Sequence, residues 1–222
     1  MEEYKYILMA GGTYPKWETP RQLLELNGEP IIARTIRLLR ERGVTDIAIS
    51  SNNDAFEQLG VPVLRHENGY VGIEYDNYKG YWCDGFYPTD VPTCYLFGDV
   101  VFSPAAIQTI VQTETDDIEF FGSAPPFSSQ YIKPWIEPFG FKVRDTGHLR
   151  EAIELVKRMD SEGRYNRKPI AWELWNAIDR GYETDPNYIV YTSYIHINDY
   201  TCDIDGPNEA VLVEIFAGLT KE

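Results

Sequence analysis

Short apolar runs alternate with helix-like patterns along the first half of the chain. The runs have strand length and are bounded by glycine or polar residues, whereas the segment behind Pro30 repeats its apolar residues at helical spacing and stops at Gly43. This alternation predicts a doubly wound α/β fold with a largely parallel central sheet flanked by helices. Strands are expected at residues 6–9, 46–50, 61–65 and 93–97, and helices from residue 31 to Gly43 and from residue 54 to Gly60.

The second half of the chain continues with elements of both kinds. Ser103-Pro104 is typical of a helix start, because serine caps the first turn and proline fits its first position. Strands are expected at 118–122, 139–143, 188–191 and 194–197, and helices at 104–112, 148–160, 169–181 and after residue 209. With 222 residues the chain can form one domain with a real core, and nothing requires a second.

The first predicted strand leads into a glycine pair, Gly11-Gly12, followed by a polar loop with two cations, Lys16 and Arg21. Glycines let backbone N–H groups turn toward an anion, and the cations could neutralise a polyphosphate. The segment is therefore interpreted as a phosphate-holding loop. A simple tight turn is the alternative, because glycine pairs are common after strands.

Ala10-Gly11-Gly12, Pro20-Arg21, the run 23–26 and Gly28-Glu29-Pro30-Ile31 together resemble the N-terminal signature of the GT-A-fold nucleotidyltransferases. These enzymes include sugar-phosphate, molybdenum-cofactor and phosphocholine nucleotidyltransferases. Lys16 stands near the usual arginine and Arg21 where the family has lysine, so the charge is kept but the contact geometry differs. The resemblance implies a Rossmann-like, mixed but mostly parallel sheet, and it implies nucleotide binding by Met9, Ala10, Gly11, Gly12, Thr13, Lys16 and Arg21, with Lys16 and Arg21 also catalytic.

Two acidic motifs continue this resemblance. Leu96, Gly98, Asp99 and Phe102 match the family's metal-binding pattern L-x-G-D-x-x-F, and Asp203-Ile204-Asp205 is similar to its D-I-D end motif. The resemblance implies that Asp99, Asp205 and Asp203 hold Mg²⁺, which prefers carboxylate and phosphate oxygens, and that Asp99 is catalytic. Turn capping by Asp99 and helix capping by Asp205 are the structural alternatives.

Aromatic residues are concentrated in the irregular segment 66–92 and again near residues 135 and 172. Asn77 and Tyr78 are candidates for nucleotide binding, since the first segment loosely resembles cytidylyltransferase elements. Lys133, Trp135, Trp172 and Glu173 are candidates for acceptor binding. Lys133 could contact the acceptor phosphate, Trp172-Glu173 is similar to an aromatic-Glu pair of choline-phosphate enzymes, and the aromatic faces would attract a quaternary ammonium group. Ordinary core packing is the alternative for these aromatic residues. Lys142 is a further candidate for contact with the acceptor phosphate, and a solvated surface lysine is the alternative.

Composition narrows the classes of partner. Lys and Arg number 20 against 35 Asp and Glu, giving a formal net charge of -15, which argues against a nucleic-acid backbone as partner. Three cysteines without C-x-x-C spacing, and His66, His148 and His196 without a shared pattern, indicate neither a disulfide framework nor a zinc site. The chain shows no signal-peptide pattern and no membrane-length apolar run, so a cytoplasmic protein is expected. The sequence pattern predicts no particular oligomeric state.

These features together predict an Mg²⁺-dependent transfer of a nucleotidyl group from a nucleoside triphosphate to a small phosphorylated acceptor, with release of pyrophosphate. CTP is the favoured nucleotide. We expect one domain, 1–222, with residues 1–115 mainly nucleotide-binding and 116–200 mainly acceptor-binding. The alternatives are a sugar-1-phosphate uridylyl- or guanylyltransferase, a GT-A glycosyltransferase, and a non-catalytic nucleotide-binding protein.

Overall fold

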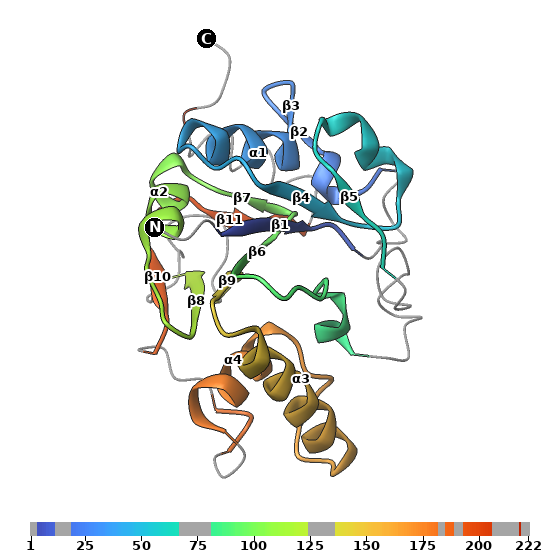
Figure 1. Cartoon of the computed structure of the whole chain (residues 1–222), viewed down its shortest axis with the longest axis vertical. Helices are drawn as coiled ribbons and strands as arrows, with labels where there is room; N and C mark the ends of the chain where they lie inside the picture. Colours follow the sequence, from blue (N-terminus) through green and yellow to red (C-terminus); the bar gives the residue numbers. More distant parts are fainter. Residues whose placement is uncertain are drawn as a thin grey trace.

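The computed structural model describes residues 4–11, 19–66, 81–123, 136–181, 185–188, 193–205 and 218. Within these ranges a seven-stranded sheet lies at the centre, in the order β10-β8-β9-β6-β1-β4-β5 (Figure 1). Its strands are β1 (Lys5–Met9), β4 (Ile47–Ser50), β5 (Val63–Leu64), β6 (Thr93–Phe97), β8 (Ile118–Ser123), β9 (Pro138–Val143) and β10 (Ile195–Ile197).

The sheet is mixed but mostly parallel. β9 runs antiparallel to its neighbours β6 and β8, and the other strand pairs of this sheet are parallel. Every residue of β4 and β6 is buried, as expected for strands covered on both faces. Met9 pairs in register with Ser50 and Phe97, so the carboxyl ends of β1, β4 and β6 share one edge. The predicted fold class is confirmed.

Helices cover both faces of this sheet. Figure 1 shows α1 (Ile31–Glu41) and α2 (Pro104–Gln112) on one side and α3 (Thr146–Ser161) and α4 (Ala171–Arg180) on the other. Ser103 caps α2, since its Oγ accepts the Ala106 N–H at 2.9 Å, and Pro104 takes the first position as predicted. The 3₁₀ helices η1 (Arg21–Leu23), η2 (Asp54–Leu59) and η4 (Trp82–Gly85) lie in the connections.

Two small antiparallel pairs accompany the main sheet: β2 (Glu25–Leu26) with β3 (Glu29–Pro30), and β7 (Val100–Val101) with β11 (Cys202–Asp203). Residues from both pairs meet in a small apolar cluster that is separate from the main core. Its buried members are Leu26, Ile31, Val101, Cys202 and Ile204. This cluster joins the N-terminal segment to the residues near 203, so both can contribute to one site.

The predicted elements differ from the structure mainly at their ends. The strand expected at 61–65 is reduced to Val63–Leu64, and the helix expected from residue 148 begins at Thr146 because Asp145 caps it through the His148 N–H at 2.9 Å. The strand expected at 188–191 falls mostly outside the described residues, as does the terminal helix, of which only residue 218 is described. Among the described helices, none has the length and apolar character needed to cross a membrane.

Candidate active site

Asp99 lies in the tight turn between β6 and β7, at the carboxyl edge of the main sheet. The preceding residue, Gly98, donates its N–H to the Met9 carbonyl at 2.9 Å, which ties this turn to the end of β1. A Cβ at position 98 would lie 2.8 Å from the Met9 carbonyl oxygen, closer than real Cβ contacts come. Glycine is therefore required here for Asp99 to stand beside the end of β1.

Asp205 reaches the same edge from the other end of the chain. β11 pairs antiparallel with β7, with Asp203 opposite Val100, and the Ile204 N–H donates to the Asp99 carbonyl at 3.0 Å. The buried side chain of Glu137 supports this segment, because its Oε2 accepts the Asp203 N–H at 3.2 Å. Backbone pairing thus places both acidic motifs side by side.

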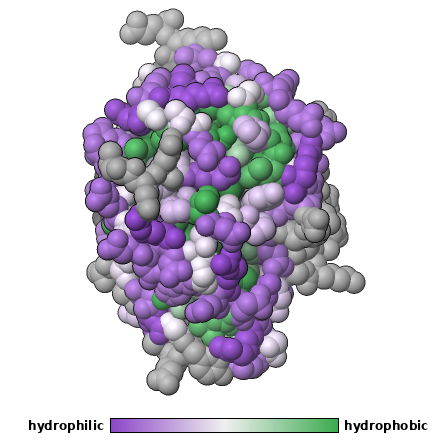
Figure 2. Space-filling model, in the orientation of Figure 1, coloured by the Kyte–Doolittle hydropathy of each residue, from purple (hydrophilic) through white to green (hydrophobic). Residues whose placement is uncertain are grey.

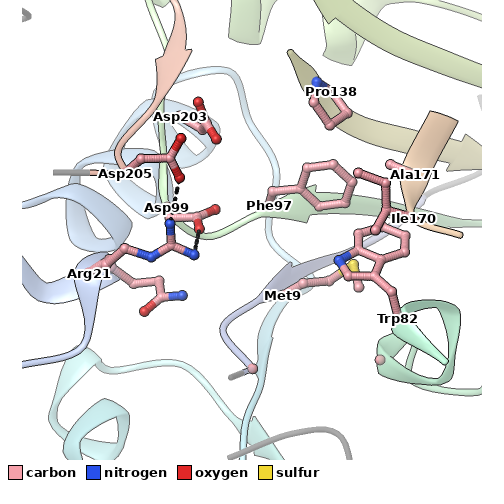
Figure 3. A pocket seen from close by; sticks show the side chains of 13 residues that line it. Met9, Arg21, Trp82, Phe97, Asp99, Pro138, Ile170, Ala171, Asp203 and Asp205 are labelled. Atoms are coloured by element: carbon pink, nitrogen blue, oxygen red, sulfur yellow. Dashed lines mark hydrogen bonds and ion pairs between the residues drawn. The ribbon is translucent and has the colours of Figure 1, made fainter. Parts of the chain in front are cut away.

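Arg21 joins the two carboxylates. Its Nη2 lies 2.9 Å from Asp99 Oδ2 and its Nη1 lies 2.8 Å from Asp205 Oδ1, as Figure 3 shows. Nη1 also donates to the Ile204 carbonyl at 3.3 Å. Arg21 begins the 3₁₀ helix η1, whose turn is closed by the Leu24 N–H donating to the Arg21 carbonyl. Acids from opposite halves of the sequence therefore meet at one guanidinium.

Burial and neighbouring charge shift both partners. Burial raises the pKa of Asp99; Arg21 opposes this shift, and the carboxylates of Asp203 and Asp205 add to it. Burial lowers the pKa of Arg21, but the field of Asp99, Asp205 and Asp203 outweighs burial and holds that pKa above its usual range. Three carboxylates facing one guanidinium leave the cluster negatively charged. A further cation at this place would therefore be stabilised.

The donor chemistry of this cluster fits Mg²⁺ when a phosphate completes the site. Mg²⁺ usually takes one or two carboxylates and fills its remaining positions with phosphate oxygens and water. Among the residues that the structure describes, no group of three or more His, Cys, Asp or Glu side chains is placed to hold a metal ion alone. Asp99 and Asp205 could thus supply the protein ligands of a metal site that a phosphate group completes. Asp99, Asp203 and Asp205 are not placed to form a metal site by themselves.

A cavity of about 190 Å³ opens beside these acids. Figure 3 shows Arg21, Asp99, Asp203 and Asp205 grouped on one side of it and Trp82 with other apolar residues on the opposite side. The outer surface in Figure 2 is mainly hydrophilic, with hydrophobic residues gathered in one area of its upper half. The described lining residues are Met9, Gly11, Arg21, Gln22, Trp82, Gly85, Phe97, Asp99, Pro138, Ile170, Ala171, Asp203 and Asp205.

Six of the residues expected to form the site line this cavity: Met9, Gly11, Arg21, Asp99, Asp203 and Asp205. Ala10 lies next to them but is buried, and its N–H donates to the Ser50 carbonyl at 3.0 Å. The remaining candidates for nucleotide binding and two of those for acceptor binding lie outside the described residues: Gly12, Thr13, Lys16, Asn77, Tyr78, Lys133 and Trp135.

The structure gives Trp172 and Glu173 other roles than acceptor binding. Trp172 is 3% exposed and packs edge-to-face against Phe120 and Tyr194, so it belongs to the core. Glu173 accepts the Ile170 N–H at 3.0 Å, which caps α4, and pairs with Arg167 at 2.8 Å. Neither side chain lines the cavity.

Lys142 is neither solvated nor available for a phosphate. It is 2% exposed, and its Nζ donates to the carbonyls of Ile110, Val111 and Thr113 at the C-terminal end of α2. Burial lowers the pKa of this ammonium group. Lys142 therefore caps a helix, a role in which its positive charge also meets the negative end of the helix dipole.

Several lining residues were not among the predicted site residues: Gln22, Trp82, Gly85, Phe97, Pro138, Ile170 and Ala171. The sequence holds a signal for two of them. Gln22 directly follows Arg21, and Phe97 is the last strand residue before Gly98-Asp99. Trp82 and Ile170 reach the cavity through tertiary packing, for which the sequence pattern holds no local sign.

Comparisons with solved structures agree with this architecture. The inositol-1-phosphate CTP transferase from T. maritima is 14% identical, with 98% of this chain and 96% of that chain covered and a TM-score of 0.55. HddC from Yersinia pseudotuberculosis complexed with GMP-PN is 14% identical, with 96% and 99% covered and a TM-score of 0.54. The CTP:phosphocholine cytidylyltransferase from Streptococcus pneumoniae is 17% identical, with 96% and 99% covered and a TM-score of 0.54. At these identities the likeness shows the fold.

Among curated proteins, none is significantly similar to the chain in sequence. A family model does match it: that of the MobA-like NTP transferase domain, over residues 6–152, which is more than half of the chain. The matched range contains β1, the glycine turn, Arg21 and Asp99. The chain therefore belongs to the family of MobA-like NTP transferases, and it is a nucleotidyltransferase by that membership.

Proposed function

We propose that this protein joins a nucleoside triphosphate, with CTP favoured, to a small phosphorylated acceptor and releases pyrophosphate. The observation that carries the proposal is the convergence of Asp99, Asp205 and Arg21 beside the end of β1, at the ligand edge of the sheet. Residues 1–115 would serve mainly the nucleotide and residues 116–200 mainly the acceptor.

In this reaction an oxygen of the acceptor phosphate attacks the α-phosphorus of the triphosphate. The bond from the α-phosphorus to the oxygen that bridges it to the β-phosphorus breaks, and pyrophosphate leaves with that electron pair. The acceptor phosphate is already anionic, so no side chain has to remove a proton. The protein's contribution is alignment of the two phosphates and compensation of their charge.

The residues of the cluster divide this work. The Gly11 backbone and the Arg21 guanidinium would face the phosphates, and Arg21 offers several N–H donors in one plane. Asp99 and Asp205 would hold Mg²⁺, which when bound with the nucleotide supplies positive charge to the phosphate oxygens. Asp203 adds negative charge nearby and, through its backbone, keeps β11 on β7.

The identity of the base and the acceptor is a further part of the proposal. Two solved structures of similar fold are named for CTP, one acting on inositol-1-phosphate and one on phosphocholine, which supports CTP and an aminoalcohol or similar phosphate. A sugar-1-phosphate uridylyl- or guanylyltransferase is the second candidate, favoured by the GMP-PN bound to HddC. The run Gly98-Asp99-Val100-Val101 lacks the second acid of the D-x-D that glycosyltransferases of this fold usually carry.

The test is a substrate panel read by pyrophosphate release in the presence of Mg²⁺. CTP, UTP, GTP and dTTP are each combined with choline phosphate, ethanolamine phosphate, glycerol phosphate, inositol-1-phosphate and glucose-1-phosphate. We expect turnover with CTP and one of the alcohol phosphates. Asp99→Asn should lower kcat by about 10²–10³-fold, the loss that is typical when one group that stabilises the transition state is removed.

Asp46→Asn provides the matched control for this experiment. Asp46 undergoes the same chemical change but pairs with Lys5 near the start of β1, away from the cavity. Its variant should retain wild-type turnover. Absence of acceptor-dependent pyrophosphate release with every pair would refute the proposed function, and equal activity of Asp99→Asn and wild type would remove Asp99 from the site.

A further inference from the structure

The cavity has an apolar end that the proposed chemistry does not use. Trp82 and Phe97 stand there with Met9, Pro138, Ile170 and Ala171, across the cavity from the charged cluster (Figure 3). The apolar residues come from η4 (Trp82), β6 (Phe97), β9 (Pro138), the start of α4 (Ile170 and Ala171) and the end of β1 (Met9), whereas Gly11 and Arg21 come from the segment after β1. An acceptor with its phosphate near Arg21 would direct its other end toward this apolar wall.

The wall is built to be rigid. The Trp82 indole packs edge-to-face with Phe86 and Phe97, with ring centroids 5.6 and 5.3 Å apart. Asp84, two residues later, accepts the Tyr81 N–H at 3.1 Å and pairs with Lys157 of α3 at 3.0 Å.

A second contact fixes the residue before Trp82. The Nζ of Lys168 lies 4.1 Å from the centroid of the Tyr81 ring, within the range of a cation–π interaction. Trp82 is therefore anchored on both sides in sequence, by Tyr81 and by Asp84. A side chain held in this way is preorganised to bind and does not need to close over a ligand.

The chemistry of the wall discriminates between acceptor classes. Sugar hydroxyls placed against Phe97, Ile170 and the Trp82 ring would lose several hydrogen bonds to water, and the single indole N–H of Trp82 could replace only one of them. A methylated ammonium group has no N–H to satisfy, it is attracted by aromatic faces, and the negative cluster at the other end of the cavity favours its charge.

We propose that Trp82, Phe97 and Ile170 form a subsite that selects acceptors whose phosphate is linked to a quaternary ammonium group, in preference to sugar phosphates. This inference rests on the proposed function for the position of the acceptor phosphate. Under this proposal Trp82, and not the buried Trp172, is the tryptophan that contacts the ammonium group of the acceptor.

The kinetic test compares three acceptors: choline phosphate, its neutral carbon isostere 3,3-dimethylbutyl phosphate, and glucose-1-phosphate. The wild type should use choline phosphate best, the isostere less well and the sugar phosphate least. Trp82→Leu should raise the KM for choline phosphate about 5- to 30-fold, the range of a cation–π contact, and leave the KM for the triphosphate within about twofold. Equal increases in both KM values, or better use of the sugar phosphate by the wild type, would overturn the proposal.

A second variant guards against misfolding. Ile170 occupies the N-cap position of α4, where threonine is a favourable residue, so Ile170→Thr should fold while making the wall more polar. This variant should also raise the KM for choline phosphate more than the KM for the triphosphate. Tyr188→Leu is the aromatic control, because Tyr188 is 64% exposed and does not line the cavity. Its kinetics should match those of the wild type.

Calorimetric binding of choline phosphate separates this inference from the proposed function. If the wild type binds choline phosphate and Trp82→Leu binds it about 5- to 30-fold more weakly, the subsite stands even when no pyrophosphate is released, and only the proposed function fails. If both proteins bind it equally, or the wild type does not bind it, the subsite is refuted even when another acceptor is turned over.

Discussion

His66 should make the stability of the fold depend on pH. It follows β5 and is 9% exposed; its Nε2 is hydrogen-bonded to Ser50 Oγ, and its backbone N–H donates to Asn52 Oδ1 at 3.0 Å. Burial lowers the pKa of His66 to about 4, whereas a histidine in an unfolded chain titrates near 6.5. The native state therefore prefers the neutral ring.

The sign of the effect follows from proton binding. Between pH of about 6.5 and 4 the unfolded chain binds the proton and the native state does not, so falling pH favours unfolding. The stabilisation by neutral His66 is complete above about pH 6.5 and is lost as the pH falls toward 4. The difference between the two pKa values corresponds to roughly 3 kcal/mol in the limit, and about 2 kcal/mol of it is lost between pH 7 and pH 5.

Urea unfolding at pH 7, 6 and 5 measures this effect in wild type and His66→Gln. Glutamine does not titrate and keeps hydrogen-bonding groups near Ser50, so the variant should lose about 2 kcal/mol less than wild type over this interval. His196→Gln is the control, because His196 is exposed. Parallel pH profiles for His66→Gln and wild type would show that His66 does not titrate with a lowered pKa.

Three other substitutions test the site and the frame that holds it. Arg21→Gln removes the group that joins two carboxylates, and we expect kcat/KM for pyrophosphate release to fall about 10²-fold; a change below twofold would assign Arg21 a structural role alone. Gly140→Ala should lower the free energy of unfolding by about 2–3 kcal/mol, since the alanine Cβ would lie 2.4 Å from the Tyr95 carbonyl oxygen. Urea unfolding measures this loss, and an unchanged free energy of unfolding would contradict the prediction. Lys142→Met leaves three carbonyls at the end of α2 without their donor, so thermal and urea unfolding should show a loss of about 2–3 kcal/mol while turnover per folded molecule stays at the wild-type value; a fall in turnover would place Lys142 in the site after all.

Much of the fold could be predicted because the central parallel strands β4 and β6 are buried on both faces and therefore appear as continuous apolar runs. β6 is the clearest example, since its five buried residues lead directly into Gly98-Asp99. The contact of Asp99 with the residues near 205 is implied by the family resemblance. The local hydrophobic pattern does not show it, because β7 and β11 are too short to produce one.

Tertiary packing determines the roles of those residues whose sequence pattern fits both the core and a ligand site. Trp172 and Trp175 lie one helical turn apart, a spacing that suits a core stripe and a ligand site equally well, and only their contacts with Phe120 distinguish the two. Trp82 reaches the cavity because Asp84 and Tyr81 are held against other elements. Lys142 left no sequence signal of its burial, because it alternates with Phe141 and Val143 as a solvent-facing strand residue would, and its three carbonyl partners come from tertiary packing.

The pairing of β11 with β7 joins a segment made late in synthesis to one made much earlier. The ribosome makes residues 202–205 long after the turn that holds Asp99, so the nascent chain can form most of the central sheet while the acidic pair is still incomplete. Under the proposed function, turnover requires this late segment to dock, so turnover would report that folding is finished.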